Sequence, residues 1–506
     1  MAGNREHRQL QKQAWNADGQ DQISIVKPAE GSAPAPRPAA TVVIVRDSVP
    51  RGVEVLLLRR GDANDHNSGA WVFPGGVVDP TDRLAHKFCA GLDDVSASRR
   101  LGLPTGGLDY YVASIRECFE EAGLLLATSR PRERSSWRLP ATSALSDWRS
   151  RLRSGASEFQ DLCRSEALML LADRLRYISH WITPVGIPKR YDTRFFVAPL
   201  PPNQQVLHDG EELVAHRWIS PAAALDGSAD LRLLNATRSV LESIASFDSV
   251  ARVLAWAQDL TEIPVVLPRL ALGRSGRRAL FPHEEAWAEV GRLDPKGRCT
   301  ASYDINPESA VRLSERITRV TAHPTDPALY GRNTYVVGGE PGRDCAVIDP
   351  ASPDPLHLDA VLAAAAGPLR RIFLTDDHPD NVAAAVLLKS RANAMIVGAS
   401  TGGEVRTGQC VTVNEQARLR CIATHGQGSM HRCYVLEQES TLLACEHILA
   451  LSPGARAMPD ASLGAHLIFL WALRREQLAW LAPSRGFLIA DPQRMIAASV
   501  DQLAQT

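Results

Sequence analysis

Hydrophobic and polar positions alternate in two separate blocks of this chain. In the first block, 41–47 (TVVIVRD) and 53–60 (VEVLLLRR) are rich in β-branched and aliphatic residues, which predicts two strands joined by a short loop. Residues 112–123 (VASIRECFEEAG) repeat apolar positions at a helical interval, and their last glycine predicts the end of a helix. Further strands are expected at 192–200 and 214–220. The first block therefore mixes strands with helices.

The second block begins near Arg316 and repeats this alternation more regularly. Strands are expected at 316–323, 333–339, 345–350, 370–376 and 394–400, with helices at 358–367 and 381–391. Strands that alternate with helices in this way are typical of a layered α/β domain.

The length of 506 residues exceeds what one hydrophobic core normally supports, which favours two domains. Residues 1–39 are polar and rich in proline near their end, so we expect a mobile tail. We predict a first domain over 40–245 with an insertion at about 80–109, a helical or irregular connector over 246–315, and a second domain over 316–506.

Composition adds few constraints. The chain is 45% hydrophobic and 22% charged with a formal net charge of -1, so nothing global points to nucleic acid or a membrane surface. Nine cysteines without a C-x-x-C pair indicate reduced thiols. No run of 18 apolar residues is present, and the first residues lack the apolar core of a signal peptide. We therefore expect a cytoplasmic protein.

Three glutamates stand out on the helix predicted at 112–123. Glu117, Glu120 and Glu121 occupy positions i, i+3 and i+4, so their carboxylates share one face and repel one another. One reading is a solvated helix end. The other is a site for a hard divalent cation, which prefers oxygen ligands and turns this repulsion into binding.

The segments FPGG (73–76) and RECFEEAGL (116–124) together resemble the Nudix hydrolase box, G-x5-E-x7-R-E-U-x-E-E-x-G-U, where U is a bulky apolar residue. A contiguous box separates its first glycine from the arginine by 14 positions, whereas Gly76 and Arg116 are 40 apart, so about 26 residues are inserted. The first glutamate of the box is left unassigned. Eight positions before the arginine stands Leu108, and possible replacements are Asp79, Asp82 and Asp109.

A split box, together with HWITPVGIPKRYDTRFFVAPLP (180–201), resembles the coenzyme A diphosphatase branch of the Nudix family. This resemblance implies an α/β/α sandwich, a small nucleotide-containing substrate with CoA or acyl-CoA favoured, and Mg²⁺ or Mn²⁺ as cofactor. It implies metal ligands at Glu117, Glu120, Glu121 and the Gly76 carbonyl, and catalytic roles for Glu120, Glu121 and Arg116. The general base is a box glutamate or one from a later loop, where Glu211 and Glu212 stand. Candidate phosphate contacts are Arg59, Arg60, Arg190 and Arg194.

In the second block, 323–351 resembles the opening of metallo-β-lactamase-fold hydrolases, which implies an αββα sandwich. The ligand motif of that family is altered, and the nitrogen-rich ligand sets that two zinc ions need are incomplete in this sequence. Asp376, His378 and His425 could still hold a single ion. The remnants are Asp376, His378, Asp380, His425 and Glu446. We expect a fold kept without a working Zn²⁺ centre, acting as a non-catalytic module that regulates the enzyme or forms a homodimer. The competing hypothesis is a thioester or ester hydrolase in this half.

Overall fold

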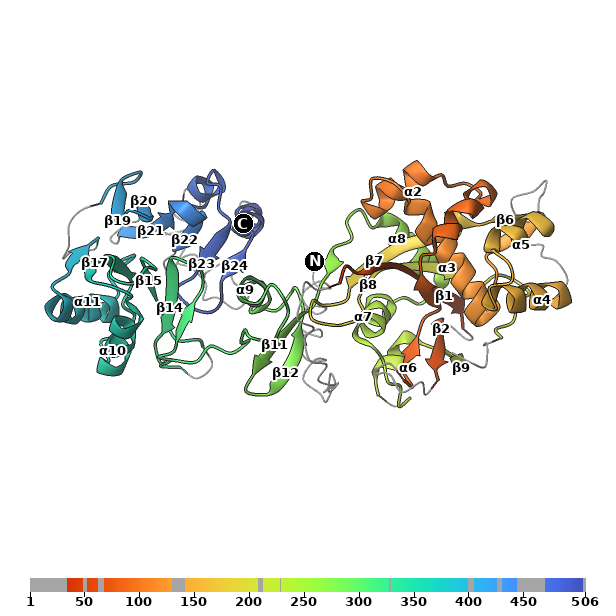
Figure 1. Cartoon of the computed structure of the whole chain (residues 1–506), viewed down its shortest axis with the longest axis horizontal. Helices are drawn as coiled ribbons and strands as arrows, with labels where there is room; N and C mark the ends of the chain where they lie inside the picture. Colours follow the sequence, from red (N-terminus) through yellow and green to blue (C-terminus); the bar gives the residue numbers. More distant parts are fainter. Residues whose placement is uncertain are drawn as a thin grey trace. The chain divides into compact units, whose positions relative to one another are not determined.

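The chain, seen here as a computed structural model, divides into two compact units, Met1–Leu267 and Pro268–Thr506 (Figure 1). Among the residues that the structure describes, no helix is both long and apolar enough to cross a lipid bilayer. The structure describes residues 34–48, 52–61, 68–129, 142–207, 213–227, 229–326, 329–398, 405–425, 430–443 and 469–503.

A mixed sheet forms the centre of the first unit. Its strand order is β10-β7-β8-β1-β2-β3, with β4 paired to β1 and β9 paired to β2. The middle of β1 is apolar on both sides of the strand because both faces of the sheet are covered. The strands are β1 Arg37–Asp47, β2 Val53–Arg60, β3 Trp71–Val72, β4 Gly75–Val77, β7 Arg176–Ile182, β8 Tyr191–Pro199, β9 Leu213–Ile219 and β10 Val265–Val266.

Helices cover both faces of this sheet. Helix α3 (Gly107–Ala122) packs on one face, where it shares an apolar cluster with Val42 and Ile44 of β1. Since strand side chains alternate, Val43 points to the other face, where α8 (Val250–Asp259) contacts β1, β7 and β8. The expected α/β/α sandwich is confirmed. The smaller elements of this unit are α4 Thr142–Arg153, β5 Ala127–Ser129, α5 Phe159–Ser165, β6 Leu168–Leu170, η2 Ala172–Arg174, α6 Pro221–Leu225 and α7 Asn235–Ile244.

The first strand begins earlier than its sequence pattern predicts. Strand β1 starts at Arg37, four residues before Thr41, because Ala39 and Ala40 pair with β8 on one side and with β4 on the other. The last residues of the expected tail over 1–39, from Arg37 on, therefore belong to the sheet. Residues 1–33 lie outside the described part of the chain. The short polar-looking stretch before Thr41 becomes a strand because neighbours far along the chain supply its hydrogen bonds.

The inserted segment is helical and belongs to the core. Its elements are the 3-10 helix η1 (Pro80–Phe88) and helix α2 (Asp94–Leu101). Phe88 and Ala97 are buried in the same apolar cluster as α3. The insertion therefore adds a layer beside α3.

Two six-stranded sheets face each other in the second unit. The first has the order β13-β14-β15-β16-β17-β18 and the second β19-β20-β21-β22-β23-β24. Side chains of both sheets, such as Val337 and Leu419, share one buried cluster between them. The strands are β13 Ala310–Arg312, β14 Ile317–Thr321, β15 Asn333–Val337, β16 Cys345–Ile348, β17 Leu369–Phe373, β18 Met395–Val397, β19 Cys410–Asn414, β20 Ala417–His425, β21 Met430–Leu436, β22 Thr441–Leu443, β23 Trp480–Ala482 and β24 Ile489–Ala490.

Helices pack on the outer faces of both sheets. Helices α10 (Pro355–Ala364) and α11 (Pro379–Ala392) share a cluster with the first sheet, and α13 (Pro492–Leu503) shares one with the second. The expected αββα sandwich is confirmed. The strands and helices predicted between Arg316 and residue 400 correspond to β14, β15, β16, α10, β17, α11 and β18.

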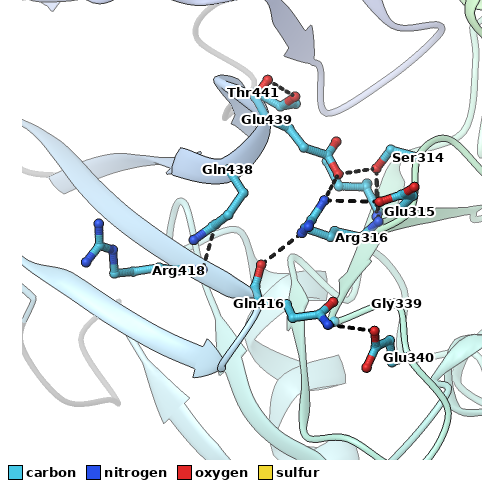
Figure 2. A network of polar contacts seen from close by, with 12 residues as sticks. Ser314, Glu315, Arg316, Gly339, Glu340, Gln416, Arg418, Gln438, Glu439 and Thr441 are labelled. Atoms are coloured by element: carbon cyan, nitrogen blue, oxygen red, sulfur yellow. Dashed lines mark hydrogen bonds and ion pairs between the residues drawn. The ribbon is translucent and has the colours of Figure 1, made fainter.

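At one end of this sandwich, polar side chains join the two sheets (Figure 2). The Arg316 guanidinium, just before β14, donates to the Gln416 carbonyl at 2.8 Å, and the Gln416 amide donates to Glu340 at 2.7 Å. The Ser314 hydroxyl donates to Glu439, in the 3-10 helix η3 (Glu437–Glu439), at 2.9 Å. These contacts hold the first sheet to the second where the apolar core ends.

The stretch 246–315, expected to be a connector, is divided between the two units. Helix α8 and strand β10 belong to the first unit, where β10 pairs with β7. The hairpin of β11 (Arg269–Gly273) and β12 (Gly276–Leu280) and helix α9 (Trp287–Leu293) belong to the second. The proline- and glycine-rich composition of this stretch reflects tight turns, such as the one between β11 and β12. Each of its elements packs within the unit to which it belongs.

Candidate active site

The glutamates lie in the last two turns of helix α3. The carboxylate of Asp94, in α2, accepts hydrogen bonds from the amides of Gly106 and Leu108 at 3.0 Å each and so caps the start of α3. The helix ends at Gly123, whose φ of 70° is in the left-handed region and whose amide donates to the Phe119 carbonyl. This confirms the glycine stop predicted from the sequence.

Strand β4 approaches these carboxylates through the Gly75 amide and the missing side chain of Gly76. The Gly75 amide donates to the Glu121 carboxylate at 2.8 Å. A Cβ atom at Gly76 would lie 2.5 Å from the nearest carboxylate oxygen of Glu117, closer than any side chain tolerates. The structure therefore brings the FPGG segment against the glutamate helix, as the split box predicts.

Arg116 is at the centre of the carboxylate group. Its guanidinium donates to Asp82 at 2.7 and 3.0 Å, to Glu117 at 2.7 Å and to the Val77 carbonyl at 2.9 Å. Glu120 lies 3.6 Å from the same guanidinium. Burial by itself would lower the pKa of Arg116, but the surrounding carboxylates outweigh it and raise that pKa.

Among the three aspartates that the sequence offered for the unassigned box position, Asp82 is the one that pairs with Arg116. Its carboxylate is buried and paired with Arg116, and burial raises its pKa. Leu108 is a core residue, Asp79 caps η1, and Asp109 pairs with Arg83 and His86. One signal was present: Asp82 stands six positions after Gly76, which is the box spacing when it is counted forward from the glycine.

The carboxylates outnumber the cation beside them. Arg116 carries one positive charge, against Asp82, Glu117 and Glu120. The pKa of Glu120 is raised to about 7, chiefly by burial and also by Glu117 and Asp82, although Arg116 lowers it. Such a group of oxygen donors fits Mg²⁺ or Mn²⁺, which are hard cations. Among the described residues no three acidic, histidine or cysteine side chains already share a metal-like arrangement, since these carboxylates turn toward Arg116 and the Gly75 amide.

The four candidate phosphate contacts differ in their surroundings. Arg190 is buried and donates to the Thr183 and Pro34 carbonyls at 3.0 and 2.9 Å. Arg194 is buried over the Tyr110 ring, at 4.5 Å from its centroid, and donates to Asp192 at 2.8 Å. Both therefore hold the framework of the sheet. Arg59, in β2, is exposed, and Arg60 is half-buried. The base candidates Glu211 and Glu212 lie outside the described residues.

In the second unit, the remnants of the zinc motif serve the protein itself. Asp376 is buried and accepts hydrogen bonds from the His378 amide at 3.0 Å and from the Asn381 side chain at 3.1 Å, and Arg332 lies 3.8 Å away. Asn381, at the place of the last histidine, also accepts from the Ala351 amide at 3.0 Å. The Asn381 side chain therefore links Ala351 to Asp376, at the position where the family motif has a histidine that binds metal.

Of the other members of that motif, the structure describes the side chains of His378 and Asp380. His378 begins helix α11, where its ring accepts a hydrogen bond from the Asp380 amide at 3.2 Å, and Asp380 is half-exposed. The backbone of His425 pairs with Met430 at the end of β20. Glu446 lies outside the described residues.

Comparison with known proteins extends this picture. Residues 93–234, all within the first unit, match the family model of the NUDT19 Nudix domain. The chain is 28% identical over 289 residues to the human acyl-coenzyme A diphosphatase NUDT19, covering 50% of this chain and 77% of that protein. It is 27% identical over 317 residues to the protein of the same name from Gallus gallus, covering 54% and 82%.

Other similarities are more distant. The chain is 28% identical over 204 residues to an atrochrysone carboxyl ACP thioesterase of Aspergillus terreus, covering 38% of this chain and 62% of that protein. Among solved structures, a Nudix hydrolase from Alicyclobacillus acidocaldarius is 25% identical with a TM-score of 0.37, covering 44% of this chain and 96% of its own. A β-lactamase domain protein from Burkholderia ambifaria is 13% identical with a TM-score of 0.34, covering 40% and 78%.

The sandwich, the carboxylate group around Arg116 and the match to the family model together show that the first unit contains a Nudix hydrolase domain. The chain is a hydrolase that acts on diphosphate bonds. More narrowly, this domain is of the NUDT19 type.

Proposed function

We propose that the first unit hydrolyses the diphosphate bond of CoA or acyl-CoA with the help of Mg²⁺ or Mn²⁺. The observation that carries this proposal is the meeting of Asp82, Glu117 and Glu120 around Arg116, beside two glycines of β4. The relatives named acyl-coenzyme A diphosphatase support the choice of substrate class.

Each residue of the site has a proposed role. Glu117, Glu120, Glu121 and the Gly76 carbonyl would hold the metal, which supplies an acidified water and neutralises charge on the phosphoryl oxygens. Arg116 holds the Glu117 carboxylate in place through a charge-assisted hydrogen bond. Glu120 and Glu121 are our candidates to accept the proton of the attacking water. Exposed Arg59 remains a candidate phosphate contact.

A product-release assay with CoA, acyl-CoA, NADH, ADP-ribose and dinucleoside polyphosphates tests the substrate. We expect cleavage of CoA or acyl-CoA to be the fastest and to require Mg²⁺ or Mn²⁺. Replacing Glu120→Gln together with Glu121→Gln should abolish it. Activity that survives this double replacement would contradict the metal-site assignment, and a preference for ADP-ribose or NADH would contradict the substrate class.

For the second unit we propose a non-catalytic role. The engagement of Asp376 by Arg332, Asn381 and the His378 amide supports it, because these contacts occupy the carboxylate inside the protein. The competing function, hydrolysis of a thioester, is suggested by the similarity to the ACP thioesterase. Zinc and iron analysis of the purified full chain, with an acyl-thioester assay, separates the two. Stoichiometric metal with thioesterase activity that is lost in Asp376→Ala would overturn our proposal.

A further inference from the structure

The end of the glutamate helix is held from outside the helix. The last four carbonyls of an α-helix have no partner within it. In α3 the Gly123 amide donates a hydrogen bond to the Phe119 carbonyl at 3.0 Å, and the Leu207 amide donates one to the Ala122 carbonyl at 2.9 Å. The remaining two belong to the residues of the glutamate pair. Arg149, in helix α4, donates Nε to the Glu120 carbonyl and Nη2 to the Glu121 carbonyl, each at 2.8 Å.

This guanidinium also supplies charge that α3 lacks. The C-terminal end of a helix carries partial negative charge, and acidic side chains there are unfavourable while cations are favourable. The last turn of α3 contains no basic residue but does contain Glu120 and Glu121. Arg149 places its cation on that turn from a separate helix.

The turn at Gly123 lies close to Arg149 and Leu207. A Cβ atom at Gly123 would lie 3.5 Å from Nη1 of Arg149 and 3.3 Å from the Leu207 side chain. Just after the same turn, the Gln204 side chain accepts from the Leu125 amide at 2.8 Å and donates to the Leu125 carbonyl at 2.9 Å. The segment 204–207 and helix α4 thus both hold the end of α3.

We propose that Arg149 is a positioning residue for the metal-binding glutamates, an inference that rests on the proposed Nudix function. It holds the backbone of the two residues whose carboxylates point to the site, and its planar fork fixes two adjacent carbonyls at once. Without it, the last turn keeps its sequence but loses the support that orients Glu120 and Glu121. Arg149 does not touch substrate and takes no proton.

Three variants of the full-length protein test this role: Arg149→Met, Arg149→Lys and the control Arg151→Met. Arg151 is exposed on the same helix and stacks on the Trp148 ring, so its replacement removes the same charge without touching α3. We expect Arg149→Met to lower kcat about 10²-fold with KM for CoA nearly unchanged, since small misplacements of catalytic groups have effects of this size. Lysine keeps the charge but reaches one carbonyl, so Arg149→Lys should recover about tenfold of the loss.

Direct Mn²⁺ titration, followed by the loss of the free-ion electron paramagnetic resonance signal, gives a readout independent of turnover. We expect the Mn²⁺ affinity of Arg149→Met to fall about tenfold while Arg151→Met matches the wild type. The thermal midpoint of each variant shows whether the fold is intact. If Arg149→Met fails to fold, Arg149→Lys against Arg151→Met decides in the same way.

The outcomes separate the two proposals. A wild-type protein that hydrolyses CoA and binds Mn²⁺, with an Arg149→Met variant equal to Arg151→Met in both respects, overturns the positioning role alone. A folded Arg149→Lys variant equal to the wild type in both respects also overturns it, because a fork that holds two carbonyls at once would then not be needed. A wild-type protein that neither hydrolyses any diphosphate substrate nor binds Mn²⁺ contradicts the proposed function itself, and the positioning role with it.

Discussion

Arg116 and Asp82 form a two-point ion pair, at 2.7 and 3.0 Å, across an insertion that separates them by 34 positions in the sequence. Asp82 lies in the first turn of η1, where it belongs to the capping box with Asp79. Its pair with Arg116 therefore fixes the inserted segment to α3 at the site itself. The Arg116 fork then has its remaining donors free to hold Glu117 and the Val77 carbonyl.

Replacing Asp82→Ala should therefore destabilise the first unit by about 3–5 kcal/mol, because it leaves the Arg116 guanidinium buried without its main partner. Hydrolysis should fall by at least about tenfold, since Glu117 loses its oriented neighbour. Asp82→Glu should keep most of the activity, as it restores the carboxylate. Thermal unfolding and kcat measure the two effects. The control is Asp109→Asn, which faces Arg83 and His86; a loss of activity as large in this control would refute the special role of Asp82.

Replacing Gly76→Ala should impair the site through a steric clash with the Glu117 carboxylate. The new methyl group would lie 2.5 Å from the Glu117 carboxylate and must displace it, while the backbone of Gly76 is outside the left-handed region and accepts alanine. We expect activity to fall about 10²-fold at fixed Mg²⁺. The thermal midpoint should change much less, because the carboxylate can swing toward solvent. Full activity at wild-type metal concentration would show that Glu117 has no role at the site.

In the second unit, Arg319 and Glu289 form a buried pair with two hydrogen bonds of 2.7 and 2.9 Å, joining β14 to α9. Glu289→Ala should destabilise this unit by about 3–5 kcal/mol, because Arg319 remains buried without its counter-ion. The double replacement Glu289→Met with Arg319→Met should be less harmful than the single one. Calorimetry of the full chain measures both. Asp344→Ala, which breaks a half-exposed pair with Arg370, should change stability by no more than about 1 kcal/mol.

The stability of the second unit should depend on pH through Asp349. Burial, and then the neighbouring Asp376, raise its pKa from 3.8 to about 7, although Thr375 donates to it. The folded state therefore binds this proton more tightly than the unfolded chain. The resulting stability is complete below about pH 4 and is lost as pH rises through about 7.

We expect Asp349→Asn to remove this dependence, since asparagine cannot ionise and tolerates the φ of 46° at this position. Thermal midpoints measured between about pH 4 and pH 8 should fall for the wild type relative to the variant. Parallel curves for the two proteins would mean that Asp349 does not titrate in this range.

Local patterns identified most elements and the reactive helix. Strands β1 and β2 and helix α3 lie where the β-branched runs at 41–47 and 53–60 and the helical period before Gly123 predict them. Each of these patterns depends on backbone and side-chain preferences within one segment. The residues that were harder to place act over long distances. Arg190 and Arg194 have the chemistry of phosphate contacts, but Arg190 donates to backbone carbonyls and Arg194 to Asp192, and no local signal distinguishes these uses.

The sequence by itself determined the carboxylate spacing on one helix face and the glycine that ends the helix, because each follows from the period of a single element. The length of the chain and its alternating strands and helices indicated two layered domains, and the resemblance to the Nudix box indicated that FPGG approaches the glutamate helix. Only the tertiary structure decided that Asp82 completes the group around Arg116, that Arg37–Ala40 joins the sheet, and that Arg149 and Leu207 close the helix end. These depend on which charges and hydrogen-bonding groups become buried next to one another, and burial gives identical side chains different roles.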